Sequence, residues 1–190
     1  MPVPVFTHRD CLLHDPGPDH PERPDRLRAI LRDLESEPAA QLLDSPLAPD
    51  ELIASVHDRA YLRQLEETAA RGGGVLDADT TMSGASWQAA LRSAGGAVAA
   101  VEHAMAGRGA AFSAGRPPGH HALRDRAMGF CLLGNAVLAA RAGRQRGARR
   151  VLIVDWDVHH GNGTQALVEH DATIRFVSLH QSPWWPGTGA

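Results

Sequence analysis

The sequence predicts an α/β fold with three layers, in which a mainly parallel sheet carries helices on both faces. Short apolar runs typical of buried strands alternate with longer helical stretches. Polar clusters follow these runs, as expected at the carboxyl ends of parallel strands. The 190 residues are predicted to form a single domain, 1–190. Because only the Gly-rich segment 186–190 ends the chain, we expect this domain to be truncated at its C-terminus.

The first half of the chain is predicted to be mainly helical. Residues 25–34 and 59–68 have the amphipathic pattern of short helices. A longer, Ala-rich helix is expected over 87–105, with Ser86 as its N-cap and Gly107 after its end. Surface loops are expected at 44–50 and 72–74.

The second half contains the strand candidates. Residues 110–113 form a short apolar run before a Gly-Pro segment, and 151–154 form a stronger one that ends at Asp155. Residues 174–178 are β-branched and aromatic. A helix over 135–145 separates the first two strand candidates, which favours crossover connections and parallel pairing.

Composition and charge exclude several classes of function. A net charge of −3 and a pI near 6.4 give no electrostatic basis for binding nucleic acid or an acidic membrane surface. The N-terminal segment lacks the apolar core of a signal peptide, and no apolar run reaches the roughly 18 residues of a membrane span. The two cysteines suggest no disulfide framework. We therefore expect a cytoplasmic globular protein, whose oligomeric state the sequence does not indicate.

The strongest chemical motif is the segment 155–163, which directly follows a predicted strand. If the chain stays extended there, Asp155, Asp157 and His159 point one way and His160 points the other. Carboxylate oxygens and an imidazole nitrogen are ordinary ligands of zinc, and also of iron or manganese. The alternative is a helix N-terminus whose polar side chains simply face water.

A second motif is the segment 116–121, which ends in the pair His120-His121. Imidazoles titrate near neutral pH, so two adjacent ones can divide acid, base and electrostatic work. Alone, the pair could equally be a surface loop or a structural pair.

Aromatic residues occupy two loops near the same predicted crevice, at 129–131 and 184–186. Flat rings could line a slot for a linear aliphatic chain. The alternative is ordinary core packing, which explains most aromatic residues.

Together these motifs resemble the histone deacetylase superfamily, which includes acetylpolyamine amidohydrolases. The order of the motifs matches that family over nearly the whole chain, and their details are closer to its class II and bacterial branch. The matching stretches are HPERPDRL (20–27), RPPGHHA (116–122), GFCLLGNAVLAA (129–140), DWDVHHGNGTQ (155–165) and SLHQSPWWPGTG (178–189). The resemblance implies an arginase-like α/β fold.

The resemblance also implies roles for the polar residues. Asp157 and His159 match two ligands of a zinc ion, with Fe²⁺ as a possible substitute. His121 matches the general base that activates the attacking water. His120 matches its electrostatic partner, oriented by Asp155.

Further roles follow from the same resemblance. Asn162 matches the residue that orients His121. Gly129, Phe130 and Trp185 match the walls of a tunnel for an acyl-lysine side chain.

A structural monovalent cation, K⁺ or Na⁺, is also expected from the resemblance. Asp155 and Asp157 would bind it together with backbone carbonyls of His159, Ser178 and Leu179.

The chain departs from the family pattern in three ways. Leu133-Gly134 stands where the family usually has Phe-Asn. The third metal ligand, an Asp, falls beyond residue 190, as does the Tyr or His that polarises the substrate carbonyl. The single tyrosine, Tyr61, matches a structural position instead.

We therefore expect the complete protein to hydrolyse an acetamide, releasing acetate and an amine. The substrate would be an acetylated lysine peptide or an acetylpolyamine, between which the sequence does not choose. The alternative is a non-enzymatic fragment that lacks the third metal ligand and the catalytic Tyr or His.

Overall fold

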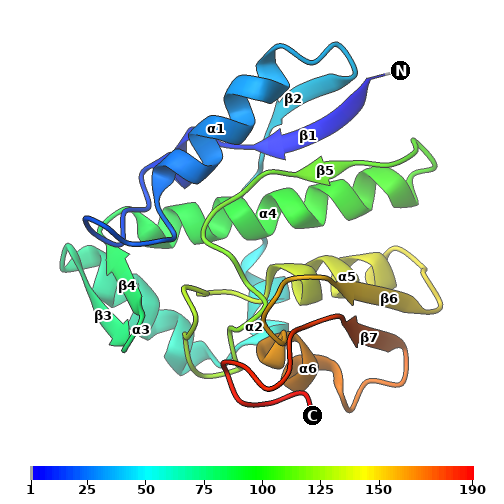
Figure 1. Ribbon diagram of the computed structural model, residues 1–190. Helices are drawn as coiled ribbons and strands as arrows, with labels where there is room; N and C mark the ends of the chain where they lie inside the picture. The colour runs from blue at the N-terminus through cyan, green and yellow to red at the C-terminus, as the bar shows by residue number, and fades with distance from the viewer. Residues whose placement is uncertain (1) are drawn as a thin grey trace.

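Two separate parallel sheets and one antiparallel hairpin contain the strands of the computed structural model, which describes residues 2–190 (Figure 1). The first sheet has the order β2-β1-β5, with β1 at Val3–Thr7, β2 at Ala40–Asp44 and β5 at Phe112–Ser113. The second pairs β6, Val151–Asp155, with β7, Ile174–Ser178. The hairpin joins β3, Gly73–Asp77, to β4, Thr80–Ser83.

The four predicted helical segments are confirmed, whereas the helices at Asp50–Val56 and Asn162–Val168 were not predicted. The α-helices are α1 (Pro24–Glu35), α2 (Asp50–Val56), α3 (Arg59–Ala70), α4 (Ser86–Met105), α5 (Asn135–Gln145) and α6 (Asn162–Val168), and a 3-10 turn spans Arg9–Leu12. The predicted bounds of α5 and β7 are confirmed, while α1, α3 and α4 are one or two residues longer than expected. Periodic apolar residues predict such helices well because one face of each is buried.

Helices cover both faces of the β2-β1-β5 sheet, with α1 on one side and α4 on the other (Figure 1). Val5, Cys11, Leu27 and Ala114 form a small buried core on this sheet. The larger core lies among α2, α3, α4 and α5. The α/β class with parallel strands is confirmed.

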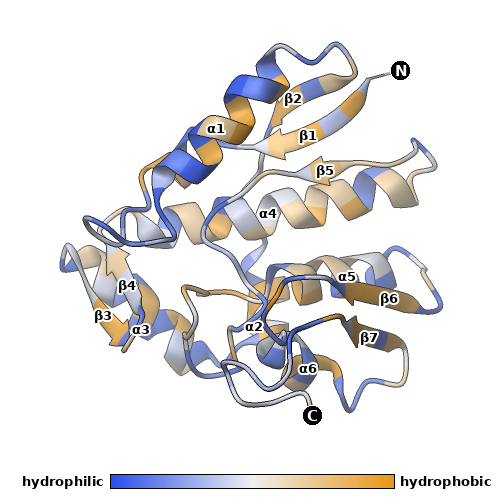
Figure 2. Cartoon of the chain, viewed as in Figure 1, coloured by the Kyte–Doolittle hydropathy of each residue, from blue (hydrophilic) through white to orange (hydrophobic). Residues whose placement is uncertain are grey.

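The β6-β7 sheet is covered on one face only within residues 2–190. Its inner residues pack against the larger core: these are Val151, Ile153, Ile174 and Phe176. Leu152, Val154 and Val177, on the other face, are 60%, 44% and 43% exposed. Figure 2 shows the hydrophobic colouring along β6. The parallel strands of residues 2–190 therefore form two sheets rather than one. Strands β5 and β6 do not pair with each other, and no strand in this part of the chain pairs with both.

Several local predictions were wrong. Strands β1 and β2 were not predicted, since β1 contains Pro4 and neither segment alternates cleanly. The Gly72–Gly74 loop is the start of β3: Gly73 has φ +117° and lies so close to the Met82 carbonyl that a Cβ would collide with it. Ser86 is the first residue of α4 rather than its N-cap, and its hydroxyl accepts the Ser83 N–H.

Within residues 2–190, none of the helices has the length and apolar character that crossing a bilayer requires. Both cysteines are free and buried.

Candidate active site

The carboxyl end of β6 turns immediately into two successive side-chain-to-backbone turns. Oδ1 of Asp155 accepts the N–H of Asp157 at 3.0 Å, and Oδ1 of Asp157 accepts the N–H of His159 at 2.9 Å. The prediction of extended backbone past Val154 was therefore wrong beyond Asp155, because short Asp side chains compete for the local N–H groups. The turns nevertheless bring Asp157 and His159 together, with Oδ1 and Nδ1 3.1 Å apart.

His160 lies on the opposite, buried side, as predicted. Its Nδ1 lies 2.7 Å from the Thr188 hydroxyl and its Nε2 lies 2.8 Å from Oε1 of Gln165. Both ring nitrogens are engaged in the interior, so His160 is a structural residue.

The segment that follows β5 carries the two adjacent histidines to the same place. Nδ1 of His120 lies 2.9 Å from Oδ2 of Asp155, and Nδ1 of His121 lies 2.7 Å from Oδ1 of Asn162. The His120 and His121 rings are 3.8 Å apart between centroids. Because an amide oxygen and a carboxylate oxygen only accept, each Nδ1 carries the proton, and neither Nε2 has a hydrogen-bond partner among residues 2–190.

The environment shifts the pKa values of two groups in this cluster. Burial, and next the neighbouring His120, lower the pKa of His121 to about 4. Burial alone would raise the pKa of Asp155, but hydrogen bonds from His120 and from the Asp157 N–H outweigh it and hold that pKa below its ordinary value. His121 is therefore neutral near pH 7, with a nitrogen that can take up a proton.

The loop at 129–130 approaches His121 with a strained backbone. Gly129 and Phe130 have φ values of +56° and +68°. Two residues that the sequence interpretation missed hold them: Asp79 Oδ1 accepts the Gly129 N–H at 3.1 Å, and the Thr80 hydroxyl accepts the Phe130 N–H at 3.0 Å. Asp79 lies in the turn between β3 and β4 and Thr80 begins β4, and neither position gave a signal, because polar residues are common at such turns.

Aromatic rings lie on both sides of this loop. Trp185 packs edge-on against His121, with ring centroids 4.6 Å apart, and against His159 at 5.6 Å. Phe130 packs edge-on against His20 at 4.7 Å. A Cβ on Gly129 would collide with the His121 ring and lie 2.7 Å from Trp185, so only glycine fits here. The opposing-wall role of Phe130 and Trp185 stays a prediction.

The residues predicted for a monovalent cation meet at the end of the β6-β7 sheet. Asp155 is in register with Ser178, and the Leu179 N–H donates to the Asp155 carbonyl at 2.8 Å. Both Asp155 carboxylate oxygens are already hydrogen-bonded. The cation itself stays a prediction.

The donor set fits part of a zinc site. Asp157 and His159 supply one oxygen and one nitrogen, which are standard zinc donors. Among residues 2–190 no cluster of three or more His, Cys, Asp or Glu side chains has a metal-binding arrangement. His180, which follows β7, engages both nitrogens elsewhere, with the Ser178 hydroxyl at 2.9 Å and the Gly189 carbonyl at 3.0 Å.

Tyr61 and the Leu133-Gly134 pair have structural roles. The Tyr61 hydroxyl donates to the Leu132 carbonyl at 2.7 Å from a buried position. The Gly134 N–H donates to Nε2 of His57 at 2.9 Å, and a Cβ there would lie 2.8 Å from Leu167. The departure from Phe-Asn is thus accommodated by tight packing around Gly134.

A neutral imidazole with a free nitrogen, beside an Asp-His pair at the carboxyl ends of parallel strands, gives this α/β fold the geometry of a candidate hydrolytic site. A model of the histone deacetylase domain matches residues 20–190. The chain belongs to the histone deacetylase family, a family of metal-dependent deacetylases and related amidohydrolases.

Several relatives and one solved structure are similar to the chain. It is 46% identical over 195 residues to the uncharacterized protein slr0245 of Synechocystis, covering 99% of this chain and 64% of that protein. A probable deacetylase of Methanothermobacter thermautotrophicus is 43% identical, over 94% of this chain and 56% of the relative. A histone deacetylase-like amidohydrolase of Pseudomonas aeruginosa is 41% identical, over 88% and 45%. The chain thus spans about half to two thirds of these relatives.

The crystal structure of the HDA15 HD domain superimposes with a TM-score of 0.94 at 36% identity, covering 99% of this chain and 58% of that one. This agreement confirms the predicted fold class and the resemblance on which it rested.

Proposed function

We propose that this chain forms the general-base side of a zinc-dependent deacetylase that hydrolyses an acetamide. The observation that carries the proposal is the placement of His121, which is neutral and donates Nδ1–H to Asn162, beside Asp157 and His159. An acetyl-lysine side chain and an acetylated polyamine both present the same acetamide on a linear chain. Both are candidate substrates.

The protein side chains would handle the protons. His121, with Nδ1 fixed by Asn162, would accept a proton from the attacking water on Nε2 and later return it to the departing amine. His120, paired with Asp155, would supply electrostatic stabilisation next to it. Zinc held by Asp157 and His159 would act as a Lewis acid towards the carbonyl and lower the pKa of water.

The loop residues would orient the acyl chain. Gly129 packs directly against the His121 ring, where no Cβ would fit, and Trp185 lies against both His121 and His159. A narrow apolar passage bounded by these residues would select a linear side chain and exclude bulk water.

The test joins this chain, at residue 190, to the segment that follows the matching region of the Synechocystis relative. The fusion is assayed with an acetyl-lysine peptide and an acetylated polyamine, and bound zinc is measured by mass spectrometry. His121→Ala should retain zinc and lower turnover by about 10²–10⁴-fold. His170→Ala, which removes a 93% exposed imidazole, is the matched control and should change neither quantity.

Two outcomes would contradict this proposal. Wild-type turnover in His121→Ala would remove its assigned role. Zinc binding that survives loss of both Asp157 and His159 would place the metal elsewhere.

A second candidate is a chain that is not an enzyme by itself. It is favoured by the finding that residues 2–190 bring together no group of three metal-binding side chains. Turnover by the unfused 190-residue chain, with stoichiometric zinc, would reject this alternative.

A further inference from the structure

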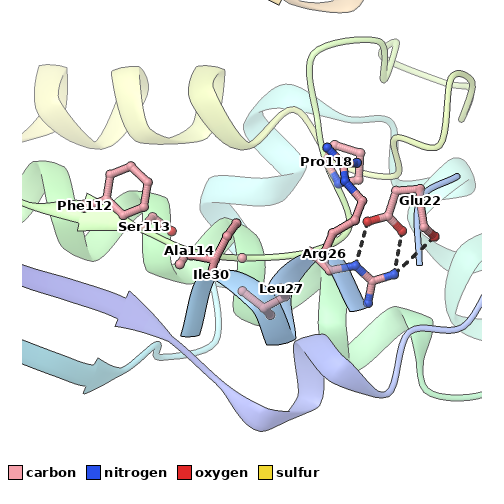
Figure 3. Close-up of a pocket in the computed structure, with 10 residues that line it drawn as sticks. Glu22, Arg26, Leu27, Ile30, Phe112, Ser113, Ala114 and Pro118 are labelled. Atoms are coloured by element: carbon pink, nitrogen blue, oxygen red, sulfur yellow. Dashed lines mark hydrogen bonds and ion pairs between the residues drawn. The ribbon is translucent and has the colours of Figure 1, made fainter. Parts of the chain in front are cut away.

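A buried ion pair lies behind the histidine loop, outside the candidate active site. The Arg116 guanidinium makes two hydrogen bonds of 2.6 Å to the Glu22 carboxylate, and these side chains are only 5% and 1% exposed (Figure 3). His14 completes the group, with its Nε2 3.2 Å from Glu22 and its Nδ1 2.7 Å from the Ser86 hydroxyl. We call Glu22, Arg116 and His14 the buried charge cluster.

Every polar group of the cluster is satisfied. Besides Glu22, Arg116 donates to the carbonyls of Cys11 at 2.7 Å and His14 at 2.9 Å. Burial alone would raise the pKa of Glu22, but hydrogen bonds from His14 and Arg116 outweigh it and lower that pKa. Well-packed apolar residues usually stabilise a fold as well as a buried ion pair does, so net stability is a weak reason for such a cluster. Directional bonds, by contrast, fix the position of the backbone that carries Arg116.

The position of Arg116 determines where the histidine loop begins. Arg116 precedes His120 by four residues, and the segment between them is tied at further points. The Pro117 carbonyl accepts from the Ser93 hydroxyl at 3.0 Å, and the His120 carbonyl accepts the Thr164 N–H at 3.0 Å. Gly119 packs directly on the Leu133 carbonyl. The loop is therefore clamped at both ends, and the buried charge cluster forms the clamp at its first residue.

We propose that Glu22, Arg116 and His14 act as positioning residues that hold the His120-His121 loop in place for its hydrogen bonds to Asp155 and Asn162. The importance of that geometry for catalysis rests on the proposed function, while the geometric effect itself does not. The cluster also joins the segments 20–27 and 116–122, because each supplies one half of the same buried ion pair.

The test replaces both charges at once, with Glu22→Met and Arg116→Met in the metal-free fused protein described under the proposed function. Single removal would leave an unpaired buried charge, whereas the double change leaves none. Glu22 and Arg116 line a cavity of about 190 Å³, which leaves room for the new side chains to settle (Figure 3).

The readout is the rate at which the Nδ1–H proton of His121 exchanges with water, measured by NMR on the fused protein labelled with ¹⁵N-histidine. This proton is held by Asn162. In the double variant we expect its exchange to be about tenfold faster, because the loop samples open positions more often. The Nδ1–H of His57, which donates to the Leu123 carbonyl at 2.9 Å in the core, reports on global folding and should not change.

The matched control is Arg59→Met, which removes an exposed pair with Glu51 and should leave both protons as in the wild type. Wild-type exchange at His121 in a folded double variant would overturn the proposal. If the double variant does not fold, Arg116→Lys decides, because it keeps the charge but loses the forked geometry. Faster exchange at His121 alone would then support the proposal, and unchanged exchange would overturn it. None of these readouts needs turnover, so failure of the deacetylase proposal would be seen separately.

Discussion

His57 should make the stability of this chain depend on pH. It has no exposed surface, its Nδ1–H donates to the Leu123 carbonyl, and its Nε2 accepts the Gly134 N–H at 2.9 Å. Both nitrogens are thus committed in the neutral ring. Burial lowers the pKa of His57 from its ordinary value near 6.5 to about 4.

The size and sign of the effect follow from that difference. As the pH falls from 7, the unfolded chain binds a proton at this histidine near pH 6.5, whereas the folded chain binds it only near pH 4. Acidification across this window therefore favours unfolding. The loss is about 3 kcal/mol, since one pKa unit corresponds to about 1.4 kcal/mol.

The assay is urea unfolding of the metal-free chain at low protein concentration, at several pH values between 7.5 and 4. Wild type is compared with His57→Gln, whose amide can replace both hydrogen bonds and does not titrate. The variant should lose the part of the pH dependence that belongs to His57. His121 contributes in the same pH range in both proteins and therefore cancels in the comparison. Equal pH dependence in the two proteins would refute the reasoning.

Three further predictions concern the site. Gly129→Ala should lower turnover of the fused enzyme at least about 10-fold, because the methyl group displaces His121; normal kinetics would show that the loop yields freely. Phe130→Ala should raise KM for an acetyl-lysine peptide and leave the melting temperature close to that of the wild type; a large fall in melting temperature with normal kinetics would make Phe130 a core residue. The unfused 190-residue chain should bind zinc weakly through Asp157 and His159, aggregate and show no measurable deacetylation, because a catalytic zinc usually has three protein ligands; stoichiometric zinc with turnover would contradict this.

The sequence predicted those elements whose burial pattern repeats over several turns or residues. Helix α5 and strand β7 have clear apolar faces, and their bounds were predicted correctly. Strands β1 and β2 were missed, because their assignment depends on pairing with each other across 37 residues rather than on local pattern. The split of the parallel strands into two sheets could not be predicted, since nothing in an isolated strand specifies its neighbours.

For the site, the sequence predicted which residues meet but not how. Asp157 and His159 meet through tight turns rather than through alternation along a strand, because each Asp side chain bonds a backbone N–H two residues on. Asp79 lacked any local signal, and the matching stretch 20–27 did not indicate what Glu22 binds, because these partners lie 50 and 94 residues away. Motif resemblance supplied the roles that spacing alone left open.

The two sheets have a consequence for how distant mutations affect this site. The histidine loop follows β5 and the Asp-His turn follows β6, and no hydrogen-bonded strand ladder joins these strands within residues 2–190. Besides the direct hydrogen bonds of His120 and His121 to Asp155 and Asn162, their relative position depends on the packing of α4 on α5. In that contact Gly143 leaves room for Val101, since a Cβ there would lie 3.1 Å from that side chain. Small changes in residue volume along this helix contact would slide one half of the site past the other. Substitutions there should be strongly non-additive with changes at His120 or Asp155, although they touch neither residue.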